Sequence, residues 1–177
     1  MREVTVFGGL GAAAAAALVL GLSACGKSSS TTAPTVSPEV TTASSNASAP
    51  TLTDAQKKGL VAELPAAYQA ADLSNGEAKF AVCRSCHTTA EGGADMTGPN
   101  LWGVFGRKAG SKADFSYSDD LKNAPWTWDA DRINKWIENP RAVLPGTKMT
   151  FIGMPDPNDR RDVIAFLKTQ TSPAPKG

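Results

Sequence analysis

The sequence predicts an all-α domain in which helices are joined by long irregular loops. Apolar residues recur at helical spacing in three segments of the C-terminal part of the chain. No alternation of apolar and polar residues typical of a β-strand runs longer than four residues. A glycine-rich loop over residues 88–110 follows the first segment, and a loop of that length in a compact domain needs something to pack on.

Residues 1–24 are predicted to be a bacterial lipoprotein signal peptide. Arg2 precedes an apolar run, residues 4–22, at the short end of the length that a membrane-spanning helix needs. Small residues directly before Cys25, in Leu22-Ser23-Ala24-Cys25, are similar to the lipobox at which such signals are cut. Cys25 is therefore the predicted lipid attachment site. An uncleaved signal anchor with an incidental cysteine is the alternative.

Residues 25–53 hold this cysteine and a linker made mostly of Ser, Thr, Ala and Pro. Such a segment cannot bury enough apolar surface to offset the entropy of ordering, so it is expected to be flexible. Its typical span would be roughly 30 Å. Residues 54–71 predict a helical stem, with Thr53 or Asp54 as the cap and Pro65 as the stop.

Residues 72–172 predict a compact domain with three main helices, and residues 173–177 a tail. The helices are expected near residues 74–87, 129–138 and 157–172. Ser74 is the predicted cap of the first, Asn139-Pro140 stops the second, and Pro173 ends the third.

The composition excludes several functions. The 18 basic and 17 acidic side chains give a formal net charge of +1, so no basic excess exists to neutralise the phosphates of nucleic acid. Nothing in the pattern resembles a catalytic constellation, so the chain is not expected to be an enzyme. The single histidine, His87, excludes a second histidine ligand for any metal.

The sequence Cys83-Arg84-Ser85-Cys86-His87 indicates covalent attachment of one haem c. Helical residues three apart lie on one face, so both thiols can each bond a vinyl group of one haem, and the next residue can bind iron. A zinc site would need a fourth ligand. A thioredoxin-like dithiol would need a βαβ context. A disulfide would leave the histidine and the four tryptophans unexplained.

The sixth iron position is left to a methionine, a lysine, a small ligand or nothing. Met96 lies on the glycine-rich loop, and Met149 and Met154 flank Phe151. Met149 ends an irregular, proline-stiffened loop that can bring a thioether to the haem face opposite His87. Core packing is the usual role of a methionine and stays the alternative for each.

A series of motifs in this domain matches a known family. They are Cys83–Thr88, Gly92-Gly93, Thr97–Leu101, Gly103–Lys108, Phe115–Tyr117, Thr127-Trp128, Asn139-Pro140, Pro145–Met149 and Asp162–Lys168. On these residues the domain resembles the class I c-type cytochromes, the group of mitochondrial cytochrome c and bacterial cytochrome c2. The resemblance implies the class I cytochrome c fold, with three main helices wrapped around a covalent haem.

The resemblance also implies roles at matching positions. Met149 is the sixth iron ligand opposite His87, and the Pro99 carbonyl accepts a hydrogen bond from the other ring nitrogen of His87. Further contacts with the haem and its propionates are implied for Arg107, Tyr117, Trp128, Thr147 and Phe151. Core packing is the alternative for Tyr117 and Trp128, and a surface position for Arg107.

The sequence departs from the family pattern at several positions. Asp95 replaces a histidine that ties two loops together, Leu121 replaces an asparagine, and Trp136 replaces a tyrosine that bonds the methionine sulfur. A collar of lysines is thinned, because other residues occupy its usual places: Val82, Met96, Ala142, Pro155 and Asp156.

The implied function is a membrane-tethered electron carrier with a His/Met-ligated haem. Its expected location is the bacterial periplasmic space, with the membrane held through lipidated Cys25. Its expected partners are redox proteins, with a donor such as a quinol–cytochrome c reductase and an acceptor such as a terminal oxidase. The alternatives are a sensor or peroxidase-like protein with a labile Met149, and a fixed haem subunit of a larger redox complex.

Overall fold

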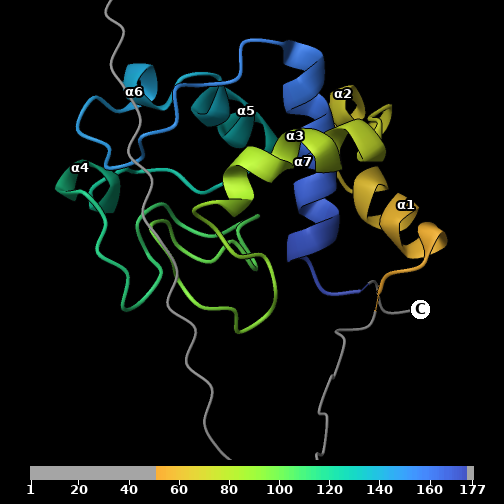
Figure 1. The fold of residues 1–177 in the computed structure, drawn as a ribbon, viewed down its shortest axis with the longest axis horizontal. Coiled ribbons are helices and arrows are strands. Elements are labelled where there is room, and N and C mark those ends of the chain that lie inside the picture. Colours follow the sequence, from red (N-terminus) through yellow and green to blue (C-terminus); the bar gives the residue numbers. More distant parts are fainter. Residues whose placement is uncertain (1–50, 175–177) are drawn as a thin grey trace, which may run out of the picture. The chain divides into compact units, whose positions relative to one another are not determined.

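A computed structural model describes residues 51–174, and its fold confirms the predicted all-α class (Figure 1). The helices are α1 (Asp54–Ala62), α2 (Ala66–Gln69), α3 (Leu73–Arg84), α4 (Asp119–Lys122), α5 (Ala130–Glu138), α6 (Pro140–Val143) and α7 (Pro157–Thr171). Within this part of the chain, the β-structure is one isolated bridge between Lys108 and Thr127. None of the described helices is long and apolar enough to cross a membrane.

The predicted signal peptide, Cys25, most of the linker and the end of the tail lie outside the described residues. The three main helices that the sequence predicts correspond to α3, α5 and α7. The short helices α4 and α6 lie within loops that the pattern left without structure.

Helices α3 and α7 cross in close contact at Gly76 (Figure 1). A Cβ at this position would overlap the carbonyl oxygen of Asp162 and come within 2.8 Å of the Cβ of Phe166. One turn further along α3, the ring of Phe80 packs on that of Phe166, with centroids 5.6 Å apart. Only glycine allows this close approach, and the contact sets how α3 and α7 cross.

Helix α3, which the sequence predicts near residues 74–87, begins and ends earlier than the pattern predicts. Asp72, rather than Ser74, is its N-cap, and the Asp72 carboxylate accepts from the backbone N–H groups of Ser74 and Asn75. A carboxylate at this end also suits the helix dipole. Because α3 ends at Arg84, His87 lies beyond the helix in the following turn.

The stem, residues 54–71, packs onto the domain as part of its core. Thr53 caps α1 with a reciprocal capping box, as predicted, and α2 starts directly after Pro65. Leu60, Val61, Leu64 and Tyr68 are buried within the described residues. The Tyr68 hydroxyl donates to Asp131 of α5 at 2.7 Å.

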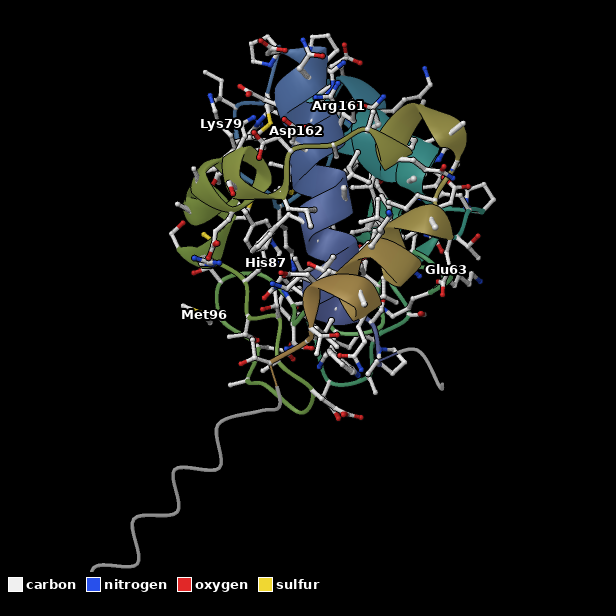
Figure 2. The ribbon with its side chains drawn as sticks, turned by 90° about the vertical axis from the view of Figure 1, so that its right-hand side faces the viewer. Glu63, Lys79, His87, Met96, Arg161 and Asp162 are labelled. Carbon is white, nitrogen blue, oxygen red and sulfur yellow. The ribbon has the colours of Figure 1, made fainter. Side chains whose placement is uncertain are left out.

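An ion pair also links the stem to the last helix, between Glu63 and Lys168 of α7 at 2.7 Å. In Figure 2, α1 of the stem lies in front of the lower part of α7, and α2 lies to the right of α7.

Candidate functional site

An apolar cavity of about 340 Å³ lies between α3, α5, α7 and the loops that join them. Its lining includes every residue of the domain that the sequence predicts to contact iron, haem or a propionate: Cys83, Cys86, His87, Pro99, Arg107, Tyr117, Trp128, Thr147, Met149 and Phe151. The nominated Cys25 lies outside the described residues. Of the three methionines considered, Met149 lines the cavity, Met154 is buried elsewhere in the core, and Met96 is half exposed.

The end of α3 brings both thiols to the cavity. The backbone N–H groups of Cys86 and His87 both donate to the carbonyl of Cys83, at 3.1 and 3.0 Å, which closes a tight turn after the helix. Cys83 and Cys86 form no disulfide. Burial is the main cause that raises the pKa of the Cys83 thiol to about 11, and the neighbouring Cys86 adds to it.

The imidazole of His87 is fixed on one side of the cavity. Its Nδ1 lies 2.7 Å from the Pro99 carbonyl oxygen, which can only accept, so Nδ1 carries the proton and Nε2 keeps a free lone pair. Burial lowers the pKa of His87, although the bond to Pro99 opposes this in part. A Cβ at Gly98 would overlap the imidazole ring, so only glycine allows the loop to pass this close.

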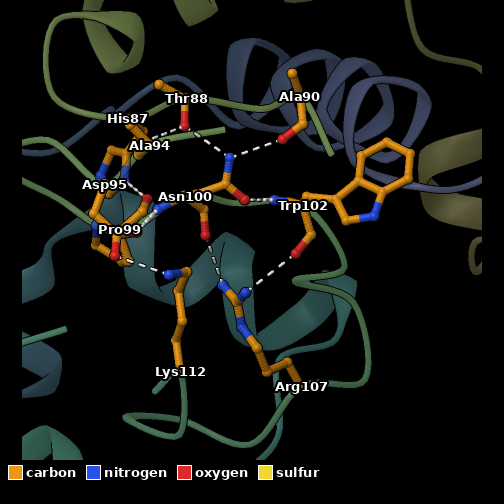
Figure 3. A network of polar contacts seen from close by, with 10 residues as sticks. All are labelled: His87, Thr88, Ala90, Ala94, Asp95, Pro99, Asn100, Trp102, Arg107 and Lys112. Atoms are coloured by element: carbon orange, nitrogen blue, oxygen red, sulfur yellow. Dashed lines mark hydrogen bonds and ion pairs between the residues drawn. The ribbon is translucent and has the colours of Figure 1, made fainter. Parts of the chain in front are cut away.

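Asn100 holds the loop behind His87 (Figure 3). Only 4% exposed, it donates from Nδ2 to the Thr88 hydroxyl at 2.7 Å and to the Ala90 carbonyl at 2.9 Å. Its Oδ1 accepts from the backbone N–H of Trp102 at 2.9 Å. Sequence reasoning placed Asn100 in a motif but gave it no role; an amide after proline in a glycine-rich loop is a signal for such a turn.

Arg107 and Asp95 tie the same loop to its neighbours (Figure 3). The guanidinium of Arg107 donates to the carbonyls of Trp102 and Asn100, at 3.1 and 3.2 Å. Asp95 accepts from the backbone N–H of Asn100 at 2.7 Å and pairs with Lys112 at 2.8 Å, and the Lys112 bond is the main cause that lowers its pKa. At the position where the family resemblance implies a histidine, the Asp95–Lys112 ion pair therefore connects the glycine-rich loop to the segment that follows it.

Met149, which also lines the cavity, is held by two hydrogen bonds. The indole Nε1 of Trp136 donates to the Met149 sulfur at 3.1 Å, and the Met149 N–H donates to the Thr147 hydroxyl at 3.1 Å. The Trp136 ring meets that of Trp128 edge to face, with centroids 5.4 Å apart. Trp136 was singled out in the sequence only as a departure, and here it supplies the donor that a tyrosine would have supplied.

The remaining wall combines a polar end with an apolar middle. Tyr117, Ser118 and Thr147 are buried polar side chains at one end. Burial is the main cause that raises the pKa of the Tyr117 hydroxyl. Leu121 lines the cavity where relatives carry an asparagine, so this part of the wall is apolar.

The lining of the cavity thus includes an imidazole, a thioether and two cysteine sulfurs. No cluster of three or more His, Cys, Asp or Glu side chains able to hold a bare metal ion occurs in residues 51–174. This donor set fits an iron whose other ligands come from a macrocycle, and the polar end suits acidic substituents of such a group.

Comparisons with known proteins point the same way. Residues 73–171 match the family model for cytochrome c. The chain is 49% identical over 104 residues to cytochrome c2 of Rhodomicrobium vannielii, covering 59% of this chain and 83% of that protein. It is 42% identical to cytochrome c of Chlamydomonas reinhardtii over 58% of this chain and 93% of that protein.

A solved structure also resembles the described domain. Cytochrome cH from Methylobacterium extorquens is 43% identical, with a TM-score of 0.51, and the match covers 55% of this chain and 98% of that one.

Proposed function

This chain belongs to the cytochrome c family and carries electrons on a covalent haem c, and we propose that it does so while tethered to a bacterial membrane in the periplasmic space. Cytochromes of this family are electron carriers and not enzymes. Their haem supplies an iron that changes reversibly between the ferric and ferrous states. The chain's own residues bind and orient that group, exclude water from it and leave one edge accessible.

The single observation that carries the haem assignment is the cavity that unites all ten nominated residues. Cys83 and Cys86 would form the two thioether bonds. His87, oriented by Pro99, and Met149, oriented by Trp136 and Thr147, would be the axial ligands. With His87 and Met149 as its ligands, the iron would keep no open position for a substrate, which suits outer-sphere electron transfer.

The polar end of the cavity is assigned to the haem propionates. Tyr117 and Thr147 offer hydroxyl groups there, Trp128 offers an indole N–H, and Arg107 adds a positive charge whose direction is fixed by two backbone carbonyls. Phe151 would pack near the exposed edge of the haem. The alternative of a ligand sensor requires Met149 to leave, and its two hydrogen bonds favour the carrier over that reading.

Two sets of variants test the haem assignment. Replacing Cys83 and Cys86 by serine should let acid–organic extraction remove the haem, which stays with the wild-type protein. Met149→Ala should abolish the weak far-red band of methionine bound to ferric iron, whereas Met96→Ala and Met154→Ala should retain it. Loss of the band in Met154→Ala instead would reassign the sixth ligand.

The tether is supported by the lipobox-like sequence before Cys25 and by the linker that joins it to the stem. Additional acyl chains on one residue anchor a protein stably, whereas one chain binds only marginally. We expect Cys25→Ala to move the protein from the membrane fraction into the soluble fraction and to slow respiration-linked electron flow. Retention of the Cys25→Ala protein on membranes after a high-salt wash would contradict the lipid tether. A donor such as a quinol–cytochrome c reductase and an acceptor such as a terminal oxidase are the proposed partners.

A further inference from the structure

Three of the four tryptophans form a row of rings that ends at the haem cavity. The rings of Trp126 and Trp128 meet edge to face with centroids 6.2 Å apart, and those of Trp128 and Trp136 with centroids 5.4 Å apart. Trp128 and Trp136 line the cavity, and Nε1 of Trp136 donates to the Met149 sulfur at 3.1 Å. Trp126 is partly exposed and lies outside the lining. We refer to Trp126, Trp128 and Trp136 as the tryptophan row.

Backbone hydrogen bonds fix the outer half of the row. The N–H of Ala109 donates to the carbonyl of Trp126 at 3.0 Å. The N–H of Trp128 donates to the carbonyl of Arg107 at 2.9 Å. Thr127, between the two tryptophans, forms the isolated β-bridge of the described residues. Residues two apart in such an extended segment project to the same side, so the rings of Trp126 and Trp128 lie together.

Helix α5 carries both the inner tryptophan and an arginine that covers the outer one. The guanidinium of Arg132 lies over the ring of Trp126, 4.8 Å from its centroid. Trp136 follows Arg132 by four residues, and side chains at this spacing lie on the same face of a helix. One rigid helix therefore supports both ends of the row.

The outer indole has a polar group with nothing to bond. Nε1 of Trp126 is buried and has no hydrogen-bond partner among residues 51–174, although buried donors in proteins are nearly always paired. An indole that has lost one electron becomes acidic at this nitrogen and gives up its proton where a base can take it. Burial of Nε1 away from any acceptor in this part of the chain favours retention of the proton. An oxidised Trp126 would then stay a strong oxidant and draw an electron from the next ring.

We propose that the tryptophan row is a second electron route, which leads from the haem to strong one-electron oxidants that reach the surface at Trp126. The proposal rests on the covalent haem of the proposed function. Trp126 gives one electron to the oxidant and is refilled from Trp128, which is refilled from Trp136. Trp136 recovers its electron from the ferrous iron through the sulfur of Met149. One ferrous iron becomes ferric and one oxidant molecule is reduced, with no bond formed or broken and no proton released.

The energetics favour this direction. An oxidised indole is a far stronger oxidant than a ferric haem with histidine and methionine ligands, so the electron moves downhill to the row. The positive charge of Arg132 lies against the outer ring and disfavours a positive charge there, which favours its passage inward to Trp128. Electron transfer slows steeply with distance, and both steps within the row are direct ring contacts. The row would thus repair a damaged indole with an electron that the carrier can replace.

Pulse radiolysis of the ferrous holoprotein tests the route. Azide radicals, supplied in smaller amount than the protein, are the probe, because each takes one electron from an indole and becomes azide. Direct oxidation of the haem should give a prompt phase. We expect a delayed phase to follow, in which the absorbance of oxidised indole decays as that of ferric haem rises. The rate of the delayed phase should not depend on protein concentration, because the electron moves within one molecule.

Trp126→Phe should lose the delayed phase, because phenylalanine is much harder to oxidise than tryptophan. Trp102→Phe is the matched control and should keep it. Trp102 is also partly exposed, but it forms no aromatic pair in the described residues. The haem spectrum and the prompt phase should be unchanged in both variants, since neither side chain lines the haem cavity.

Oxidation products in the unmodified protein provide a second test. After exposure to azide radicals, mass spectrometry compares the products at Trp126 with those at Trp102, in ferrous and in ferric holoprotein. Only ferrous iron can refill the row, so the ratio of Trp126 to Trp102 products should be lower in the ferrous protein. An equal ratio in both forms would overturn the proposal, as would a delayed phase in Trp126→Phe equal to that in Trp102→Phe. A protein without a c-type haem spectrum before the pulse would refute the haem assignment instead.

Discussion

Replacing Trp136 by phenylalanine should lower the reduction potential. The change removes the indole N–H that donates to the Met149 sulfur at 3.1 Å but keeps an aromatic ring beside Trp128. A sulfur bound to ferric iron gives up more electron density than one bound to ferrous iron, so it is the poorer acceptor in the ferric state. The hydrogen bond therefore stabilises the ferrous form more, and its loss favours the ferric form.

The size of the effect follows from the worth of the bond. A neutral hydrogen bond contributes about 0.5–1.5 kcal/mol. If about half of that differs between the two oxidation states, the difference is about 0.25–0.75 kcal/mol. Because a tenfold change in a one-electron equilibrium corresponds to 59 mV and to about 1.4 kcal/mol, the potential should fall by about 10–30 mV.

Spectroelectrochemical titration of the purified holoprotein measures this shift. The far-red methionine band should persist in Trp136→Phe, since the sulfur then donates more strongly to the ferric iron. Trp136→Tyr is the matched control, because its hydroxyl offers a donor again and should return the potential most of the way to that of the wild type. Packing alone cannot predict this rescue, since tyrosine and phenylalanine fill nearly the same volume.

A potential that rises in Trp136→Phe, or that falls equally in Trp136→Tyr, would refute the reasoning. The first result would mean that the bond favours the ferric state. The second would mean that the shift comes from the smaller ring and not from the lost donor.

Three further variants test the frame around the site by thermal or chemical unfolding. Gly76→Ala should destabilise the protein, since overpacking against α7 costs about 1–3 kcal/mol and exceeds the roughly 1 kcal/mol that alanine gains in a helix; the same change at exposed Gly59 of α1 should stabilise instead. Asp95→Asn should lower the free energy of unfolding by about 0.2–1 kcal/mol near neutral pH, because the bond to Lys112 lowers the pKa of Asp95 in the folded protein. The difference should be fully present above the unfolded pKa of about 3.9 and should vanish as the pH falls through the lower folded pKa. A difference that does not change with pH would contradict this. Tyr68→Phe should cost about 1–2 kcal/mol through the lost bond to a carboxylate, and an unchanged stability would show that this hydrogen bond does not help to hold the stem.

The sequence predicted those parts of the molecule that repeat a pattern or carry rare chemistry. Helical periodicity located α3, α5 and α7, and the C-x-x-C-H run located one edge of the cavity. The pattern misplaced the N-cap of α3, because Asp72 and Ser74 are both good N-cap residues. The choice between them depends on where α7 packs against Gly76.

Other features depend on contacts that no local pattern contains. The buried network of Asn100 joins carbonyls and hydroxyls of a loop without periodicity. The bond from Trp136 to Met149 needs two segments brought together by the fold, so the sequence could raise the substitution but not its geometry. The stem was expected to be a helix, yet its apolar face is too short for its packing site on α7 to be read from the sequence.

The docked stem has a mechanical consequence for a tethered carrier. The chain enters the described domain at Thr53, through a helix whose far end is bound to Lys168, and no residue of the stem lines the haem cavity. In Figure 2, Glu63 of the stem and Met96 of the glycine-rich loop lie on opposite sides of the view. The proposed tether would therefore join the domain at a place separate from the lining of the cavity. A pull on the proposed linker would act on the stem and not on the residues that line the cavity, so holding the protein would not compete with electron transfer.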